Sequence, residues 1–516
     1  MRTLNTIKNI LTGLLLQIIT LLLGFISRSV FIKEIGIDML GLNGLLTNIL
    51  SMLGIVELGV GTAIYYSLYK PLSEKNYNQI RAIMNLYSKM YRIMGISVAI
   101  LGMSMIPLLN GIIEIEATNQ YVITVYLIFL LDSVMTYFLS YRRNILSADQ
   151  KNYVVNKVSS ISFVIMSLLQ IIVMKVTKNY VLYILVKVII GIVQNIYIYI
   201  LTSKKYSYLK LKSTIELDST IKKDIIKNTK ALFLVQIAGY CVFGTDNILL
   251  SVFCGITIVG IYSNYTLIIN TINGLVMQIF NGIKASFGNF LVEKSMEEAH
   301  SIFNILYFIN FWITTFCSIS LVTLLNPFIE IWIGKEIILS MWSVSIIVFN
   351  FYLRGMTQSI DLVRNSAGLY SPYPFFKYWA LIEGILNLVV SLILAGPMGM
   401  GMYGIFLGTS ISTFLNVFVL PWNVYKYVFN MPCKQYYIKY LRYILTSGML
   451  AFITYNVAAN LEVKSIFITF IIKCIVCLIL PNILILLFFK NTDEFKYLLN
   501  KFRIKESFYK KLKILT

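Results

Sequence analysis

Nine ionisable side chains interrupt stretches of this sequence that are otherwise strongly apolar. A charged group in hydrocarbon costs several kcal/mol, so residues of this kind pair with one another or border a water-filled path. Arginine and lysine can hold a phosphate, and carboxylates can gate a path or take up a cation. The nine positions are Arg28, Glu57, Asp132, Lys187, Asp246, Arg354, Asp361, Glu383 and Lys473.

Three polar residues share one face of an expected helix. Arg354, Gln358 and Asp361 follow one another at i, i+4 and i+7, and this spacing brings side chains to the same side of a helix. A polar stripe in an apolar segment predicts a wet interior beside it. The alternative is a structural pair between Arg354 and Asp361.

Arg28 lies about one helical turn from the outer end of the first apolar segment. Snorkelling of its guanidinium to the membrane interface is one explanation. Asp246 occupies nearly the corresponding place in a later segment, and Asn247 aligns with Arg28 at an offset of 219 residues. Polar groups at equivalent positions of two halves suit a shared central site or an outer gate.

The remaining candidates differ in their settings. Glu57 lies among glycines in "GIVELGVGTAIYYSL", where close helix packing or local unwinding is expected. Asp132 is in the middle of its segment, where gating, titration and capping of a neighbouring helix are all open. Lys187 is close enough to the end of its segment to reach the outer interface.

Fourteen apolar segments carry these side chains, each near the roughly 20 residues that a bilayer core requires. They are 10–31, 42–68, 86–109, 121–140, 154–176, 180–202, 229–253, 256–282, 303–325, 340–362, 375–395, 400–424, 438–459 and 465–489. In this arrangement 35 of the 44 Lys and Arg fall on one face of the membrane, and an excess of this kind marks the cytoplasmic side. We therefore predict an all-α, multi-pass membrane protein with both termini in the cytoplasm.

An internal repeat divides the chain. "IGIDMLGL" (35–42) and "CGITIVGI" (254–261) match at an offset of 219 residues, each just after an apolar segment. Six segments per copy give both copies the same orientation, related by an axis along the membrane normal. The expected organisation is a six-helix lobe (1–202), a cytoplasmic linker (203–228), a second six-helix lobe (229–425), a terminal helix pair (426–489) and a basic cytoplasmic tail (490–516).

Several classes of function are disfavoured. No G-x-x-x-x-G-K-[ST] phosphate loop occurs, His300 is the only histidine, and no cluster of metal ligands is present in the sequence. The net charge of +21 is explained by cytoplasmic loops that face anionic headgroups. We expect no metal, no bound cofactor and no nucleic-acid partner.

Several stretches, taken in order, resemble the bacterial polysaccharide-unit flippases of the multidrug/oligosaccharidyl-lipid/polysaccharide exporter superfamily. They are "ELGVGTAIYYSLYKPL" (57–72), "SYRRNILSADQKNY" (140–153), "TDNILLS" (245–251), "VGIYSNYTLI" (259–268) and "RNSAGLY" (364–370). The resemblance extends over essentially the whole chain, and its specificity comes from the order and spacing of the motifs.

The resemblance implies an alternating-access carrier that is not an enzyme. Such a carrier moves undecaprenyl-diphosphate-linked oligosaccharides from the inner to the outer leaflet of the bacterial plasma membrane for cell-surface polysaccharide synthesis. It has a V-shaped pair of lobes around a cationic cavity. The implied substrate-binding residues are Arg28, Lys187, Arg354 and Gln358. The implied gating or ion-coupling residues are Glu57, Asp132, Asp246, Asn247 and Asp361, with H⁺ or Na⁺ as the coupling ion.

The implied partners are the lipid-linked oligosaccharide, membrane lipids, a polysaccharide polymerase and glycosyltransferases. Two alternatives belong to the same superfamily, a cation-coupled multidrug exporter and a lipid II flippase. A third, from a different class, is a membrane polysaccharide polymerase. That enzyme should carry large outer loops, and the outer loops expected here are short.

Overall fold

The structure, a computed structural model, describes the backbone of residues 2–54, 67–68, 71–109, 113, 118–149, 151–210, 244–367 and 374–500. All regular secondary structure in these ranges is helical, so the expected all-α class is confirmed. Helices suit an apolar chain in hydrocarbon because every backbone N–H and C=O is paired within the segment itself.

The chain forms two compact units. The first comprises Met1–Ser263 with Lys377–Leu388, and the second comprises Asn264–Phe376 with Val389–Thr516. The helices α12 (Ile256–Glu293) and α15 (Pro374–Ala395) contribute residues to both units. The lobe boundaries expected from the sequence stay a prediction.

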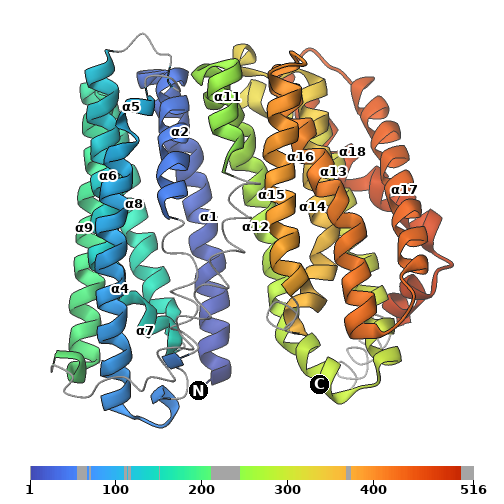
Figure 1. The fold of residues 1–516 in the computed structure, drawn as a ribbon. Coiled ribbons are helices and arrows are strands. Elements are labelled where there is room, and N and C mark those ends of the chain that lie inside the picture. Colours follow the sequence, from blue (N-terminus) through green and yellow to red (C-terminus); the bar gives the residue numbers. More distant parts are fainter. Residues whose placement is uncertain are drawn as a thin grey trace, which may run out of the picture. The chain divides into compact units, whose positions relative to one another are not determined.

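The first unit contains the helices of the N-terminal half and one short helix beyond it. They are α1 (Arg2–Ile35), α2 (Ile37–Leu53), α4 (Tyr77–Ser104), α5 (Ile106–Leu109), α6 (Asn119–Ser140), α7 (Arg143–Ala148), α8 (Asn152–Thr177), α9 (Tyr180–Lys205), the 3₁₀ turn η2 (Ser207–Lys210) and α11 (Asp246–Cys254). Within this unit α1 packs against α8, and α6 packs against both α4 and α9 (Figure 1).

The second unit is built around α13. Its helices are α13 (Met296–Trp332), the 3₁₀ turn η3 (Lys335–Ile337), α14 (Met341–Ser366), α16 (Gly401–Val424), the π-helical turn η4 (Tyr425–Phe429), α17 (Lys434–Ala459) and α18 (Ile466–Phe489). α13 packs against α14, α17 and α18, and α14 also packs against α16.

Seven helices within the described ranges are long and apolar enough to cross a membrane. They are α6, α8, α9, α13, α15, α16 with η4, and α18. The chain is therefore a multi-pass membrane protein. The number of fourteen spans stays a prediction.

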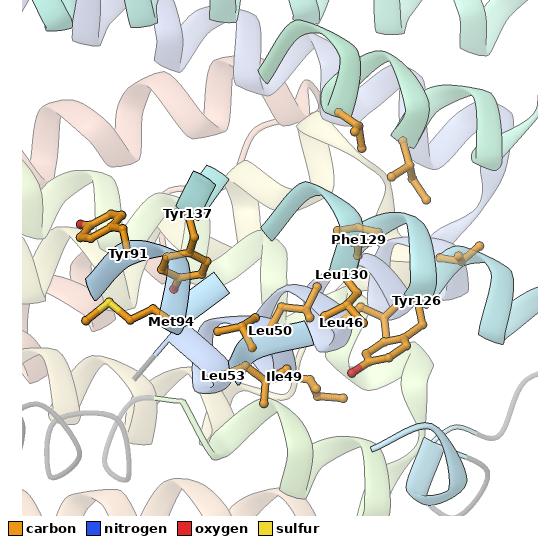
Figure 2. Packing of buried hydrophobic residues seen from close by; sticks show 14 of the residues in the cluster. Leu46, Ile49, Leu50, Leu53, Tyr91, Met94, Tyr126, Phe129, Leu130 and Tyr137 are labelled. Atoms are coloured by element: carbon orange, nitrogen blue, oxygen red, sulfur yellow. The ribbon is translucent and has the colours of Figure 1, made fainter. Parts of the chain in front are cut away.

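Apolar side chains from α2, α4 and α6 form part of the core of the first unit (Figure 2). Leu46 and Leu50 of α2 lie beside Phe129 and Leu130 of α6 in this cluster. Gly102 of α4 allows the close approach, because a Cβ there would lie 2.4 Å from a methyl carbon of Leu130. This packing fixes α2, whose other end carries the residues described next.

Candidate functional site

Two glycines mark corresponding turns in the two halves of the sequence. Gly36 separates α1 from α2 with φ of 103°, and Gly255 separates α11 from α12 with φ of 86°. Positive φ at these values favours glycine, which has no Cβ to clash with the backbone. The two turns are 219 residues apart, so the predicted sequence match is also a match of backbone conformation.

After these turns, α2 and α12 meet at a contact between backbones that we call the α2–α12 crossing. A Cβ on Gly41 would lie 2.1 Å from the carbonyl oxygen of Ile256, and a Cβ on Gly260 would lie 2.4 Å from that of Ile37. The four residues form two repeat-related pairs, so the contact is self-complementary, as at a two-fold interface. Only glycine fits at either position without moving the helices apart.

Side chains add polar bonds beside the crossing. Thr257 Oγ1 donates a hydrogen bond to Asp38 Oδ1 at 2.5 Å, and these two residues are also 219 positions apart. The Arg28 guanidinium donates to the carbonyl oxygen of Ser263 at 3.1 Å and to its Oγ at 2.9 Å. The Ser263 hydroxyl donates in turn to the Gly260 carbonyl at 2.7 Å. α1 is thereby tied to the first turns of α12.

The Arg28 contact has no equivalent across the pseudo-two-fold relation. Asn247 and Gly44 occupy the positions that correspond to Arg28 and Ser263, and a glycine offers no side chain to bond. The Oδ1 atom of Asn247 is buried and has no hydrogen-bond partner within the described ranges. The sequence predicted a pair at equivalent positions, and the structure gives the two members different surroundings.

Lys187 and Asp132, two predicted site residues of opposite charge, form an ion pair in the first unit. Lys187 Nζ lies 3.5 Å from Asp132 Oδ2, and it also lies 4.8 Å from the centre of the Phe129 ring. The lysine side chain is 37% exposed and the aspartate 22%. The charge of Lys187 is therefore paired with that of Asp132 in this structure, and any further anion would compete with Asp132 for it.

The predicted polar stripe of α14 forms the accessible face of that helix. Between residues 351 and 363, every residue is buried except Arg354, Gln358 and Asp361. The other faces are covered by α13 and α16, since Asn310 of α13 donates to the Gly355 carbonyl at 3.0 Å. The stripe is thus the least buried face of this part of α14, and the wet interior expected beside it stays a prediction.

The partner of Asp361 differs from the one that the stripe suggested. Asp361 Oδ1 lies 2.8 Å from an Arg364 nitrogen, one turn further along α14. The structural pair considered for Arg354 and Asp361 is therefore replaced by a pair between Asp361 and Arg364. Gln358 lies between the two cations on the same face.

The structure gives less information about two further candidates, Asp246 and Glu57. Asp246 is the first residue of α11 and is 9% exposed, a position where the helix dipole favours a negative charge. Glu57 lies outside the described residues. The gating and ion-coupling roles of both residues stay predictions. Within the described part of the chain, no group of three or more metal-ligating side chains comes together.

The sequence reasoning missed four of the residues described above. They are Asp38, Thr257, Ser263 and Arg364. Asp38 and Thr257 occupy the same position in the two repeated octapeptides, and Arg364 follows Asp361 at i+3. The repeat and the i+3 spacing were therefore both visible in the sequence. Ser263 carried no signal of its own.

The fold is shared with known membrane transporters. A lipid II flippase, MurJ, in its inward closed conformation aligns with a TM-score of 0.68 at 16% identity, over 93% of this chain and 99% of that chain. An inward-facing multidrug resistance MATE family transporter of the MOP superfamily aligns with a TM-score of 0.57 at 13% identity, over 77% and 91%. A mutant of the Vibrio cholerae MATE transporter VcmN aligns at 0.56 and 15% identity, over 82% and 97%.

These identities are low, so the similarity establishes the fold. No family model matches the sequence, and no curated protein matches it. The chain thus has the fold of the flippase and MATE transporters of the MOP superfamily.

Proposed function

We propose that this chain is a transporter that flips undecaprenyl-diphosphate-linked oligosaccharides from the inner to the outer leaflet of the bacterial plasma membrane by alternating access. In this proposal both termini are cytoplasmic, as the distribution of Lys and Arg predicts. Polysaccharide polymerase and glycosyltransferases act on either side of the transport step, and H⁺ or Na⁺ is the coupling ion.

The observation that carries the proposal is the α2–α12 crossing. The turns at Gly36 and Gly255 lie at the ends of helices predicted to face outwards, and there the two backbones touch without intervening side chains. A glycine contact of this type brings two backbones together without interlocking side chains. Alternating access needs such a contact, one that seals in one state and separates in the other.

Arg28 connects closure to the cargo. In the structure its guanidinium is bonded to Ser263. A diphosphate is a stronger partner than a serine hydroxyl and carbonyl, because both members of the new bond are charged. Cargo that took Arg28 from Ser263 would remove one of the ties beside the crossing, and so bias the chain towards opening.

The test uses the purified full-length chain in proteoliposomes with a fluorescent undecaprenyl-diphosphate oligosaccharide. Flipping is measured as the fraction of fluorophore that a membrane-impermeant quencher reaches over time. Arg28→Ala should stop flipping while the protein still inserts. Lys33→Ala is the matched control, because Lys33 is an exposed cation five residues along the same helix. Equal flipping by Arg28→Ala and Lys33→Ala would contradict the role of Arg28.

Two alternative functions are each supported by a particular observation. The MurJ alignment covers more of this chain than either MATE alignment does, which supports lipid II as the alternative cargo. The MATE alignments support a cation-coupled multidrug exporter. The same vesicles loaded with lipid II, or assayed with cationic dyes, separate the three. Transport of dyes without movement of any lipid-linked sugar would overturn the proposal.

A further inference from the structure

The helices α13, α17 and α18 pack together in the second unit (Figure 1). Side chains of these helices line a cavity of about 260 Å³. The polar and charged residues of its wall are Thr323, Asn326, Glu330, Tyr455, Glu462 and Lys473. None of the residues predicted to bind cargo or to gate lines this cavity. It lies at the ends of the spanning helices that are predicted to face outwards, and therefore at the depth of lipid headgroups.

One side of the cavity offers a cation. The Lys473 side chain is only 12% exposed, although it sits in the apolar helix α18, and its Nζ lies 3.5 Å from Glu462 Oε1. Glu462 is 72% exposed, and a pair of this length with one partner in solvent is worth about 0–1 kcal/mol. A lysine ammonium has three N–H donors. Lys473 can therefore donate to a further anion without losing Glu462.

The part of the wall that α13 forms offers acceptors. Glu330 of α13 forms no ion pair or hydrogen bond with any described residue. Pro327 stands one turn before it inside the helix, and proline has no N–H to bond the carbonyl of the residue four positions earlier. That residue is Thr323, which also lines the cavity. A ligand that donates several hydrogen bonds from a positive group suits this side.

Asn326, which lines the cavity from the same helix, is held in place. Tyr265 donates a hydrogen bond to Asn326 Oδ1 at 2.6 Å, and Asn326 Nδ2 donates to the Leu339 carbonyl at 3.0 Å. The Leu339 N–H completes the ring by donating to the Tyr265 hydroxyl at 2.9 Å. Because these groups already satisfy each other, the site is preorganised and a ligand need not order it.

Size and surroundings indicate what kind of ligand fits. Pockets for drug-sized ligands measure about 300–1,000 Å³, so this cavity is too small for an oligosaccharide and suits a single headgroup. α18 exposes Ile468, Ile471 and Ile475 along its outer surface, where acyl chains can lie. A zwitterion with an anionic phosphate and a primary ammonium matches the charges in the wall.

We propose that this cavity binds the headgroup of a phosphatidylethanolamine molecule from the surrounding leaflet. Lys473 binds the phosphate, and Glu330 with the Thr323 carbonyl binds the primary ammonium. The lipid stays as a structural ligand between α13, α17 and α18. This site is separate from the proposed cargo path and does not depend on it.

The experiment measures lipid retention by native mass spectrometry. The full-length chain is reconstituted in nanodiscs of phosphatidylethanolamine, phosphatidylcholine or phosphatidylglycerol, and the bound lipid is then titrated. Wild type should bind phosphatidylethanolamine about tenfold more tightly than either other lipid, because a hydrogen-bonded charged group is worth about one decade in affinity. Equal affinity for the three lipids would overturn the proposal.

Three variants locate the site. Glu330→Gln should reduce the affinity for phosphatidylethanolamine to that for phosphatidylcholine, and Lys473→Gln should weaken both. Ala459→Phe should lower binding by filling the mouth, with the charges intact. The matched controls Glu336→Gln and Lys464→Gln change exposed charges at the same end of these helices and should bind as wild type. Undiminished selectivity in both Glu330→Gln and Ala459→Phe would place the lipid elsewhere, whatever the outcome of the flipping assay.

Discussion

Replacing Gly41 by alanine should open the α2–α12 crossing. A Cβ at this position would lie 2.1 Å from the Ile256 carbonyl oxygen, whereas carbon–oxygen contacts settle at about 3.3 Å or more. The helices must therefore separate by roughly 1.2 Å. The obstacle is backbone, so no rotamer change relieves it.

The separation has a cost that can be bounded. Overpacking of this kind costs about 1–3 kcal/mol, and the 2.5 Å bond between Thr257 and Asp38 would lengthen beyond hydrogen-bonding distance, which costs about 1.5–3 kcal/mol for a charged acceptor. About 1 kcal/mol of this cost is offset, because alanine has a higher helix propensity than glycine. A net loss of about 1.5–5 kcal/mol shifts the ratio of closed to open molecules by roughly 10- to 5,000-fold.

The native thiol of Cys254 is a reporter for this change, because it is only partly buried and precedes the turn at Gly255. In a variant that retains only this cysteine, a membrane-impermeant maleimide applied from outside should label Gly41→Ala at least about tenfold faster than the parent. Gly260→Ala should act in the same way, since its Cβ would lie 2.4 Å from the Ile37 carbonyl.

Gly44→Ala is the matched control. It stands on the same helix, but a Cβ there meets only a methyl group of Val259 at an ordinary 3.8 Å. Its labelling rate should equal that of the parent. If Gly41→Ala also labels at the parental rate, or if Gly44→Ala labels as fast as Gly41→Ala, the crossing does not control access and the reasoning fails.

Three further predictions concern other parts of the chain. Arg28→Lys should retain part of the flipping that Arg28→Ala loses, because one ammonium cannot reproduce a two-pronged contact; equal activity of both variants in the vesicle assay would argue against phosphate binding there. The variants Asp132→Asn and Lys187→Met, combined in a double-mutant cycle of thermal unfolding, should show a coupling of about 0.2–1 kcal/mol, since both groups are partly exposed; no measurable coupling would contradict the ion pair. Burial raises the pKa of the Cys433 thiol to about 11, partly offset by a hydrogen bond with Tyr437, so its alkylation at pH 8 should be roughly a hundredfold slower than that of a free thiol. The rate should climb with each pH step up to about 11, and stability should fall as the pH rises above the ordinary thiol value; a plateau near pH 9 would refute the shift.

Much of the architecture could be predicted from composition and spacing. Apolar segments of spanning length require helices in a bilayer, and this physical constraint leaves little choice of fold class. The repeat was visible because Gly36 and Gly255 perform the same conformational task, which few other residues could perform. The accessible face formed by Arg354, Gln358 and Asp361 followed from the geometry of one helix.

Side-chain partners were harder to predict. The pair between Lys187 and Asp132 joins α9 to α6, and it depends on how these helices rotate against each other, which the sequence does not encode locally. Arg364 follows the predicted apolar segment 340–362, whereas α14 continues to Ser366 and brings Arg364 next to Asp361. The contact between Arg364 and Asp361 therefore depends on the length of α14, which the charge pattern does not indicate.

The self-complementary crossing has a consequence for the history of the chain. A surface that meets its own copy through equal residues is what two identical polypeptides form when they pair. Gly41, Gly260, Asp38 and Thr257 keep that relation, whereas Arg28 with Ser263 has no counterpart in Asn247 with Gly44. A homodimer of half-length chains would have to carry any such bond twice or not at all. A single chain can carry one asymmetric bond of this kind, so Arg28 ties α1 to α12 while Asn247, its counterpart in the repeat, makes no equivalent bond within the described part of the chain.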